Sequence, residues 1–338
     1  MKNSKFDPQA QSSLLRSTGS EEEESKSYDY LGYIDTSSED YDDILNPCWL
    51  TGFSSGESTF VVTIYRDSRM NTGWAVQPFF AVTLHKKDYV ILKKFQEFFG
   101  GAGSISKDRK DYAQYKVFSK ADLAVVINHF NKYPLLTQKK ADFELFKSAV
   151  ELINRKEHLT LNGLKKIVTI RASMNRGLTT VLITAFPDLV PAPKQKIVDQ
   201  EIYDPNLLSG FVTAEGSFMV SLKKSPRVRV GFSVWLRFSV SQDSRDAEFM
   251  ASLENYFGCG KYYLAKNRES GDFVVQNFSD ICNKIIPFFD KHQILGVKAK
   301  DFEDWKIAAK LVAEKEHLTE SGLEKIRQIR LNMNSRRL

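Results

Sequence analysis

The sequence lacks the patterns that mark several common functional classes. No apolar run approaches the roughly 18 residues that cross a membrane, so no membrane partner is expected. Its three cysteines, Cys48, Cys259 and Cys282, are too few and too widely spaced for a disulfide framework or a zinc site. It contains no P-loop glycine pattern and no H-x-E, HNH or GIY-type nuclease pattern. These absences leave a globular protein of a reducing compartment, without a nucleotide-binding loop.

Charge is unevenly distributed along the 338 residues. Residues 1–45 contain eleven acidic and four basic residues, a net charge of −7, whereas the whole chain carries +6, which leaves +13 on the remainder. An acidic, serine-rich segment cannot bury enough apolar surface to fold, so residues 1–45 are expected to be a disordered extension. The basic remainder is typical of a protein that binds a polyanion, most simply nucleic acid.

The chain is internally duplicated. Lys156–Thr160 and Lys315–Thr319 are the same five-residue string at an offset of 159. A period of this length indicates a repeated domain rather than a solenoid. We therefore expect domains at 46–186 and 205–338, joined by a proline-containing linker at 187–204. Two similar halves in one chain suit a monomer with internal pseudo-two-fold symmetry and a roughly two-fold partner such as duplex DNA.

Hydrophobic periodicity predicts an α+β fold. In the first half, strands are expected at 59–66, 74–82, 104–107 and 112–118, and helices at 88–99, from about 120, at 138–156 and at 161–176. In the second half, residues 227–240 alternate cleanly and predict one long strand, with apolar side chains on one face. His158 and His317 precede threonines that can cap the next helix, so a structural role is expected for both.

Two short segments carry the strongest chemical signal. Leu50–Glu57 and Leu208–Glu215 are apolar helix candidates with small residues four apart, which allow two helix backbones to approach closely. If the two helices pack together, Glu57 and Glu215 emerge side by side at the negative ends of both helix dipoles. Two carboxylates in that position repel each other unless a cation joins them, which points to a hard divalent metal with oxygen ligands.

These paired segments resemble the two signature motifs of single-chain LAGLIDADG homing endonucleases, of the type encoded in fungal mitochondrial introns. The resemblance extends from about Asn46 to the C-terminus. It implies two pseudo-symmetric αββαββα halves, each with a saddle-shaped antiparallel sheet that lies in the DNA major groove. It further implies an enzyme that makes a Mg²⁺-dependent double-strand break in a long, nearly unique target during intron homing. Ca²⁺ is expected to bind without supporting cleavage.

The resemblance also assigns roles within the site. Mg²⁺ is expected on Glu57 and Glu215, helped by the backbone carbonyls of Gly56 and Ala214. Matched lysines, Lys139 and Lys298, are expected to organise water and charge near the scissile phosphates, and Gln242 to position solvent, although its counterpart in the first half is Leu84. One departure stands out, because the first acid is followed by Ser58 where a glycine is usual.

The side chains expected to face DNA follow from strand alternation, since arginine can bond guanine edges bidentately. In the second half they are Arg227, Arg229, Ser233, Trp235, Arg237 and Ser239, with Lys261 and Tyr263 on a shorter strand. In the first half they are Ala75, Gln77, Phe79, Ala81 and Thr83, with Ser104 and Ser106. A solvated sheet face is the alternative explanation for this pattern.

Two other functions are compatible with the same sequence. The chain could be an intron maturase that binds intron RNA and supports splicing with little or no cleavage, or a DNA-binding regulator on the same scaffold. A mitochondrial location is expected, with synthesis inside the organelle, because residues 1–45 are too acidic for a transit peptide. By the resemblance, such an extension is often the remnant of an upstream reading frame.

Overall fold

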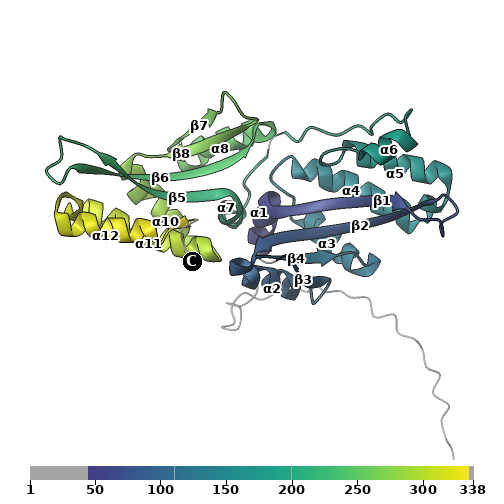
Figure 1. Ribbon diagram of the computed structural model, residues 1–338, viewed down its shortest axis with the longest axis horizontal. Coiled ribbons are helices and arrows are strands. Elements are labelled where there is room, and N and C mark those ends of the chain that lie inside the picture. Colours follow the sequence, from purple (N-terminus) through teal and green to yellow (C-terminus); the bar gives the residue numbers. More distant parts are fainter. Residues whose placement is uncertain (1–44, 110, 199, 335–338) are drawn as a thin grey trace, which may run out of the picture. The chain divides into compact units, whose positions relative to one another are not determined.

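The computed structural model describes residues 45–109, 111–198 and 200–334 (Figure 1). The predicted extension at 1–45 lies outside the described residues except for Leu45, which is only 5% exposed and belongs to the first hydrophobic core. Leu45, the last residue of the predicted extension, therefore belongs to the folded core. The described residues from Leu45 onward belong to one compact unit. The division of that unit into two domains stays a prediction.

The two halves share one order of elements up to α5 and α12, with α9, η5 and α10 in the place of α3 and no counterpart of α6 among the described residues of the second half. The α+β prediction is confirmed. The first half comprises α1 (Pro47–Glu57), β1 (Ser58–Arg66), β2 (Trp74–His85), the 3-10 turn η2 (Lys86–Asp88), α2 (Tyr89–Phe98), β3 (Ser104–Arg109), β4 (Tyr112–Val117), α3 (Lys120–Lys132), α4 (Lys139–Asn154), η3 (Glu157–Leu159), α5 (Leu161–Ser173) and α6 (Thr180–Ala185). The second comprises α7 (Pro205–Glu215), β5 (Gly216–Lys224), β6 (Phe232–Asp243), η4 (Ser244–Asp246), α8 (Ala247–Phe257), β7 (Lys261–Leu264), β8 (Ser270–Val275), α9 (Phe278–Asp280), η5 (Ile281–Ile285), α10 (Ile286–Lys291), α11 (Val297–Ala313), η6 (Glu316–Leu318) and α12 (Glu320–Leu331).

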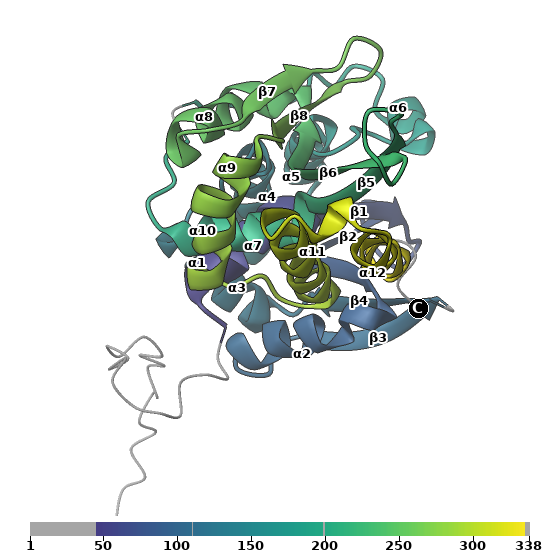
Figure 2. The same cartoon turned by 90° about the vertical axis from the view of Figure 1, so that its left-hand side faces the viewer.

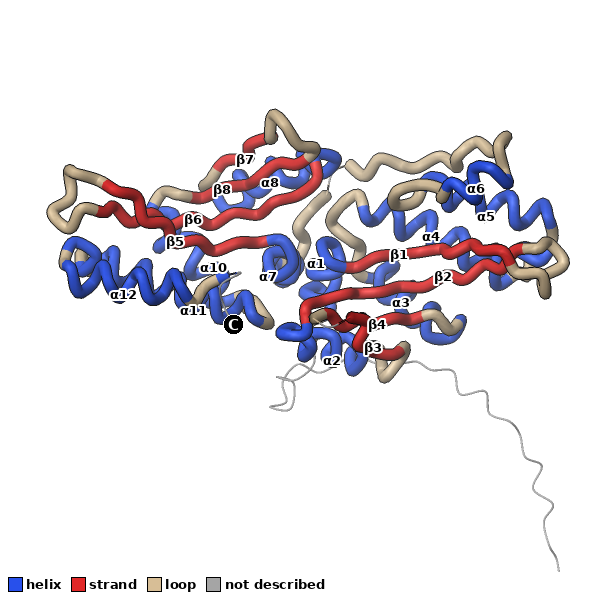
Figure 3. Tube along the Cα trace, viewed as in Figure 1, coloured by secondary structure: helices blue, strands red, loops and turns tan. Residues whose placement is uncertain are grey.

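Each half contains a four-stranded antiparallel sheet, in the order β1-β2-β4-β3 and β5-β6-β8-β7 (Figure 3). Helices cover one face of each sheet, and alternate strand residues point into the core beneath them. Phe60 and Phe218 occupy equivalent positions at the centres of the two cores, 1% and 0% exposed. Each is surrounded by four aromatic rings of its own half: Phe80, Phe130, Phe143 and Phe146 around the first, and Phe238, Phe289, Phe302 and Trp305 around the second.

The predicted long strand at 227–240 is wrong at its start. Strand β6 begins at Phe232, and residues 225–231 form the hairpin turn between β5 and β6. Ser225 N donates to Gly231 O at 2.9 Å, and Gly231 has a φ of 75°. Alternating valines in this turn imitate a strand, but Pro226 and Gly231 impose turn geometry. Arg227 and Arg229 therefore lie in the turn rather than on the sheet.

The duplicated five-residue string forms the same structure twice. Lys156 and Lys315 adopt left-handed conformations, with φ values of 61° and 63°. Thr160 Oγ1 accepts a hydrogen bond from Gly163 N at 3.1 Å, and Thr319 Oγ1 accepts one from Gly322 N at 3.0 Å. The predicted caps are therefore confirmed, and each threonine begins the helix that follows.

The segment between α6 and α7 has no helix or strand in its described parts, 187–198 and 200–204. It is nevertheless anchored to the first half. Lys194 pairs with Asp142 at 2.7 Å. The side chain of Gln138 exchanges two hydrogen bonds with the backbone of Ile197, donating at 2.8 Å and accepting at 3.1 Å. Within the described residues, no helix has the length and apolar character required to cross a membrane.

Candidate active site and nucleic-acid interface

Helices α1 and α7 pack side by side between the two sheets (Figures 1 and 2). Glycines make this contact possible. A Cβ added to Gly52 would lie 1.8 Å from Leu207 O, and one added to Gly210 would lie 2.0 Å from Trp49 O. Both distances are far below van der Waals contact, so each backbone rests directly on the other. The predicted small-residue packing is confirmed.

The two helices begin and end in the same way. Each starts with a proline after a side-chain cap: Asn46 Oδ1 accepts from Cys48 N at 2.9 Å, and Asp204 Oδ1 accepts from Asn206 N at 2.7 Å. Each ends in a glutamate, after which the chain turns directly into a strand. Glu57 and Glu215 are therefore carried to the same end of the helix pair.

Ser58 stands where a glycine is usual, and its side chain is accommodated by Ser54, one helical turn earlier. Ser58 is 5% exposed, and its hydroxyl donates to Ser54 O at 2.6 Å. In the second half Gly216 takes the place of Ser58, and Val212 takes the place of Ser54. A Cβ at Gly216 would lie 2.5 Å from Val212 Cγ1. The space at the end of each helix is thus filled by Ser54 and Ser58 in the first half and by Val212 beside Gly216 in the second.

The two glutamates are held close to each other and to the lysines. A Cβ on Gly56 would lie 3.0 Å from Glu215 Oε1, so this carboxylate extends over α1. Burial raises the pKa of Glu215, and the Glu57 carboxylate raises it further. Burial also raises the pKa of Glu57, while Lys139 and Lys298 oppose that shift. Both acids therefore favour a bound cation as compensation for their charge.

Lys139 and Lys298 point their ammonium groups at the carboxyl ends of the two helices. Lys139 Nζ donates to Gly56 O and, at 2.6 Å, to Ser58 O. Lys298 Nζ donates to Ala214 O at 2.9 Å and to Val212 O at 3.3 Å. Burial lowers the pKa of each lysine to about 8, although Glu215 and Glu57 oppose the shift. The structure thus brings both predicted acids, both predicted carbonyls and both predicted lysines into one centre.

The donor set of this centre fits a hard divalent cation. Within the described residues, no group of three or more histidine, cysteine or acidic side chains forms a ready metal cage. The centre offers instead two carboxylates and the carbonyl oxygens of Gly56 and Ala214. Mg²⁺ typically binds through one or two carboxylates and takes its other ligands from water and substrate phosphates. An oxygen set of this kind therefore matches Mg²⁺ or Ca²⁺ better than zinc.

Gln242 lies at the end of β6, where its side-chain oxygen accepts a hydrogen bond from Asp243 N at 2.9 Å. This contact belongs to the strand end and does not reach the glutamates. The equivalent residue, Leu84, is 8% exposed and packs in the first core. A role of Gln242 in positioning solvent stays a prediction.

The helix-free face of the second sheet carries polar and aromatic side chains. Trp235 is 48% exposed, its Nε1 donates to Ser233 Oγ at 3.0 Å, and Lys223 Nζ lies 4.9 Å from its ring centre. Arg237 Nε is buried and has no hydrogen-bond partner within the described part of the chain. Ser239 is 9% exposed, which leaves it little surface. Lys261 and Tyr263 add exposed positions on β7, paired with β8.

The first sheet presents an equivalent face. Gln77 and Thr83 are exposed, and Ala75 and Phe79 are half-buried, but Ala81 is 0% exposed and offers no surface. Ser104 and Ser106 on β3 are exposed and pair with Lys116 and Gln114 on β4. Ala81 is therefore an unsuitable DNA contact. The other positions remain predictions.

Sequence reasoning missed several side chains on these faces. Lys116 Nζ lies 3.9 Å from the Phe79 ring centre, and Gln114 Nε2 donates to Thr83 Oγ1 at 2.9 Å. In the second half, Arg268 pairs with Asp272 at 2.6 Å. Period-two alternation in β4 and β5 could have indicated Gln114, Lys116 and Lys223, because each shares the face of an expected contact residue.

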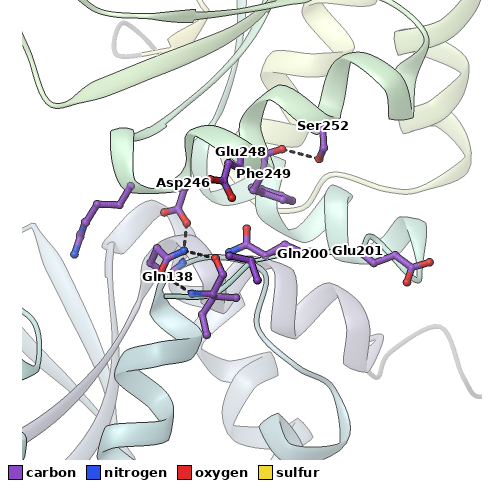
Figure 4. A pocket seen from close by; sticks show the side chains of 10 residues that line it. Gln138, Gln200, Glu201, Asp246, Glu248, Phe249 and Ser252 are labelled. Carbon is purple, nitrogen blue, oxygen red and sulfur yellow. Dashed lines mark hydrogen bonds between the residues drawn. The ribbon is translucent and has the colours of Figure 1, made fainter. Parts of the chain in front are cut away.

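A cavity of about 390 Å³ lies between the linker, η4 and α8, next to the N-terminus of α4 (Figure 4). Its lining includes Gln138, Ile197, Asp246 and Phe249, and neither glutamate of the centre. Burial raises the pKa of Asp246 to about 6. The cavity is therefore lined by neither the glutamates nor the lysines of the centre, although Gln138, one of its lining residues, immediately precedes Lys139.

Comparison with known proteins agrees with this geometry. The family model described as LAGLIDADG endonuclease matches residues 50–150 and 208–309, one segment in each half. The chain therefore belongs to the LAGLIDADG endonuclease family.

Among curated proteins, the chain is similar to two from Neurospora crassa. It is 39% identical to "Probable intron-encoded endonuclease 2" over 85% of its own length and 64% of that protein's. It is 40% identical to "Probable intron-encoded endonuclease 3" over 83% of its own length and 53% of that protein's. The chain thus spans about one half to two thirds of these relatives.

Solved structures are similar over nearly their whole lengths. The LAGLIDADG homing endonuclease I-SmaMI bound to cleaved DNA matches with a TM-score of 0.86 and 43% identity, covering 87% of this chain and 98% of that one. The same enzyme bound to an uncleaved DNA target in the presence of calcium ions matches with a TM-score of 0.84 and 43% identity, covering 86% and 99%. I-GzeII in complex with its DNA target matches with a TM-score of 0.81 and 38% identity, covering 87% and 100%.

Proposed function

We propose that this protein is an intron-encoded, site-specific DNA endonuclease that cuts both strands of a long target with a divalent metal, Mg²⁺ in the productive complex. The observation that carries the proposal is the single centre at the α1–α7 seam. There, two carboxylates with raised pKa values meet two buried lysines. The similarity to homing endonucleases crystallised on cleaved and uncleaved DNA supports it.

The chain's own residues can supply each part of the reaction. Glu57 and Glu215, with the carbonyls of Gly56 and Ala214, would hold the metal, which stabilises charge on the attacking and leaving oxygens. Lys139 and Lys298 place one positive charge near each glutamate, where it can polarise water or stabilise a phosphate oxygen. Because both lysines already contact those carbonyls, metal binding requires the ammonium groups to share or release them.

The helix-free faces of the two sheets would hold the DNA. Phosphate contacts from the basic surface give affinity, whereas Arg237, Trp235 and Gln77 are placed to contact base edges. Arg227 and Arg229, in the β5–β6 turn, extend beyond the sheet and are better placed for phosphates. Double-stranded DNA is thus the partner, bound by a single chain with two similar halves.

The cellular setting follows from the relatives. The N. crassa proteins are named as intron-encoded, and a Podospora anserina relative, 39% identical over 118 residues, is named from an ND4 intron. We propose a fungal mitochondrial location on this basis. An intron maturase on the same scaffold remains the alternative, but RNA binding alone would not require two lysines buried against two acids.

Plasmid cleavage tests the proposed function. The full chain is incubated with supercoiled plasmid that carries the uninterrupted junction of its host gene, with Mg²⁺ or with Ca²⁺. Linear product in Mg²⁺, and a bound but uncut plasmid in Ca²⁺, are expected. An intact plasmid in Mg²⁺ together with specific binding of the intron RNA would overturn the nuclease proposal in favour of the maturase.

A further inference from the structure

The segments that lead into the lysine-bearing helices cross from one half to the other. Leu136, just before α4, is 2% exposed and packs in the core of the second half. Its equivalent, Leu295, just before α11, packs against the core of the first half. The backbones of both residues are also held by the central helices, α1 and α7. Leu136 N donates to Ser55 Oγ of α1 at 3.0 Å, and Leu295 N donates to Thr213 Oγ1 of α7 at 3.4 Å.

In each of these segments, a backbone N–H just before the lysine donates a hydrogen bond to an aspartate of the opposite half. Asp88, which ends η2 in the first half, accepts a hydrogen bond from Val297 N at 2.7 Å. Asp246, which ends η4 in the second half, accepts one from Gln138 N at 2.7 Å (Figure 4). Val297 and Gln138 each immediately precede an active-site lysine, Lys298 and Lys139. The two contacts are equivalent under the internal symmetry, and both run between halves.

These contacts are tightly packed. A Cβ on Gly296 would lie 2.3 Å from Asp88 Oδ1, so only a glycine leaves room for this carboxylate. Asp246 is 5% exposed. A carboxylate that accepts from a free N–H at the first turn satisfies an otherwise unpaired donor and complements the helix dipole. Each aspartate therefore fixes where its lysine-bearing helix begins.

We propose, on the basis of the proposed function, that Asp88 and Asp246 are positioning residues that act across the halves: Asp88 places Lys298, and Asp246 places Lys139. Each lysine donates from its ammonium group to backbone carbonyls of its own half, at the end of helix α1 or α7 or, for Ser58 O, just beyond it. Its helix start, however, is tied to the other half. The arrangement couples the two halves, because a lysine is correctly placed only when the opposite half is docked.

Surrounding charge agrees with this crossed pairing. Burial lowers the pKa of Lys298, and the carboxylates opposing the shift include Glu215, Glu57 and Asp88. Burial likewise lowers the pKa of Lys139, where Asp246 is among the opposing carboxylates. Asp88 is thus near the lysine of the second half and Asp246 near the lysine of the first, each together with an acid of the lysine's own half, Asp301 and Asp142.

The test measures each DNA strand separately, with both strands of the target end-labelled and Mg²⁺ present. Lys139→Ala and Lys298→Ala first establish which lysine serves which DNA strand. Asp88→Ala is then expected to slow, by about tenfold to hundredfold, the same DNA strand as Lys298→Ala. Asp246→Ala should slow the strand that Lys139→Ala slows. Slowing of the opposite strand, or equal slowing of both strands, would overturn the proposal.

Three further variants separate positioning from general destabilisation. Asp88→Asn keeps an accepting oxygen and should cut both DNA strands at nearly the wild-type rate. Val297→Pro removes the donor N–H at a helix position where proline is tolerated, and should reproduce the strand bias of Asp88→Ala. Asp122→Ala removes a carboxylate hydrogen bond of the same kind, to Gly103 N at 3.1 Å within the first half, and should show no strand bias. A bias in Asp122→Ala, or none in Val297→Pro, would contradict the crossed pairing.

A second readout does not depend on cleavage. Reductive methylation with formaldehyde, followed by mass spectrometry, reports how accessible each lysine is. Asp88→Ala should increase labelling of Lys298 and leave Lys139 protected, with the reverse in Asp246→Ala. If the wild-type protein fails to cut DNA but the labelling pattern is crossed, the proposed function fails while the positioning contacts stand. Labelling of the lysine in the same half as the mutation would refute them.

Discussion

Gly52 of α1 lies against the carbonyl of Leu207 in α7, so closely that a Cβ on the glycine would come within 1.8 Å of that oxygen. Gly210 meets Trp49 O in the same way, at 2.0 Å. The contact is between backbones, which cannot move aside as a flexible side chain can. The position of both glutamates, at the ends of these helices, therefore depends on the absence of a Cβ at Gly52 and Gly210.

Gly52→Ala and Gly210→Ala should each destabilise the protein by about 1–3 kcal/mol or more, because the added methyl group forces the two helices apart. Urea unfolding measures the change. Equal stability of wild type and Gly52→Ala would contradict the observed packing.

The residue pairs Ser54–Ser58 and Val212–Gly216 should behave as matched units. Gly216→Ser alone places a side chain where Val212 already lies and should cost about 1–3 kcal/mol. Val212→Ser combined with Gly216→Ser recreates the first-half pair and should recover part of the loss, giving a coupling energy of about 0.5 kcal/mol or more in a double-mutant cycle. Strictly additive effects would show that the two positions are independent.

The sequence predicted the order of elements and the α1–α7 contact, because both leave local patterns. Period-two and helical alternation marked most strands and helices, and glycine spacing marked the seam. Arg227 and Arg229 were misplaced because Val228 and Val230 continue the alternation of β6 through a turn. Only Pro226 and Gly231, at the two ends of the turn, argued against one continuous strand over 227–240.

Other features could not be predicted because they arise from contacts distant in sequence. The hydrogen bonds of Lys139 and Lys298 to backbone carbonyls depend on how α4 and α11 dock beneath the central helices. The crossed contacts of Asp88 and Asp246 join residues more than 100 positions apart. Nothing in the local sequence of η2 or η4 distinguishes these aspartates from ordinary surface acids.

His129 should make the protein sensitive to acid. Its Nε2 lies 2.9 Å from Thr51 Oγ1, and burial lowers its pKa to about 3. Between about pH 6.5 and 3 the unfolded chain binds a proton that the folded protein excludes, so the free energy of unfolding falls as the pH falls, by about 1.4 kcal/mol per pH unit. His129→Phe should lose this part of the pH dependence. Urea unfolding at about pH 7.5 and about pH 5 measures it, and parallel behaviour of the two proteins would count against a buried neutral histidine.

Arginines on the sheet and in the turn should differ in their effect on DNA binding. Arg237→Ala should relax preference at one or two base pairs, at about 1–3 kcal/mol each, because its side chain lies on the helix-free face. Arg227→Ala should weaken binding to all sequences alike and reduce the salt slope by about one, as loss of a phosphate contact does. Binding to a panel of single-base target variants at several salt concentrations separates the two. A uniform loss in Arg237→Ala would place that residue on phosphate.

Glu57 and Glu215 are proposed to share one metal-dependent centre for both DNA strands. The most direct test of this proposal is cleavage and binding by Glu57→Gln and Glu215→Gln, which keep the side-chain shape and one oxygen ligand but remove the charge that holds the metal. Each single variant should fail to linearise target plasmid in Mg²⁺, leaving at most slow nicking of one DNA strand, while binding the target in Ca²⁺ nearly as tightly as the wild type. Full double-strand cleavage by either variant would show that the metal centre lies elsewhere.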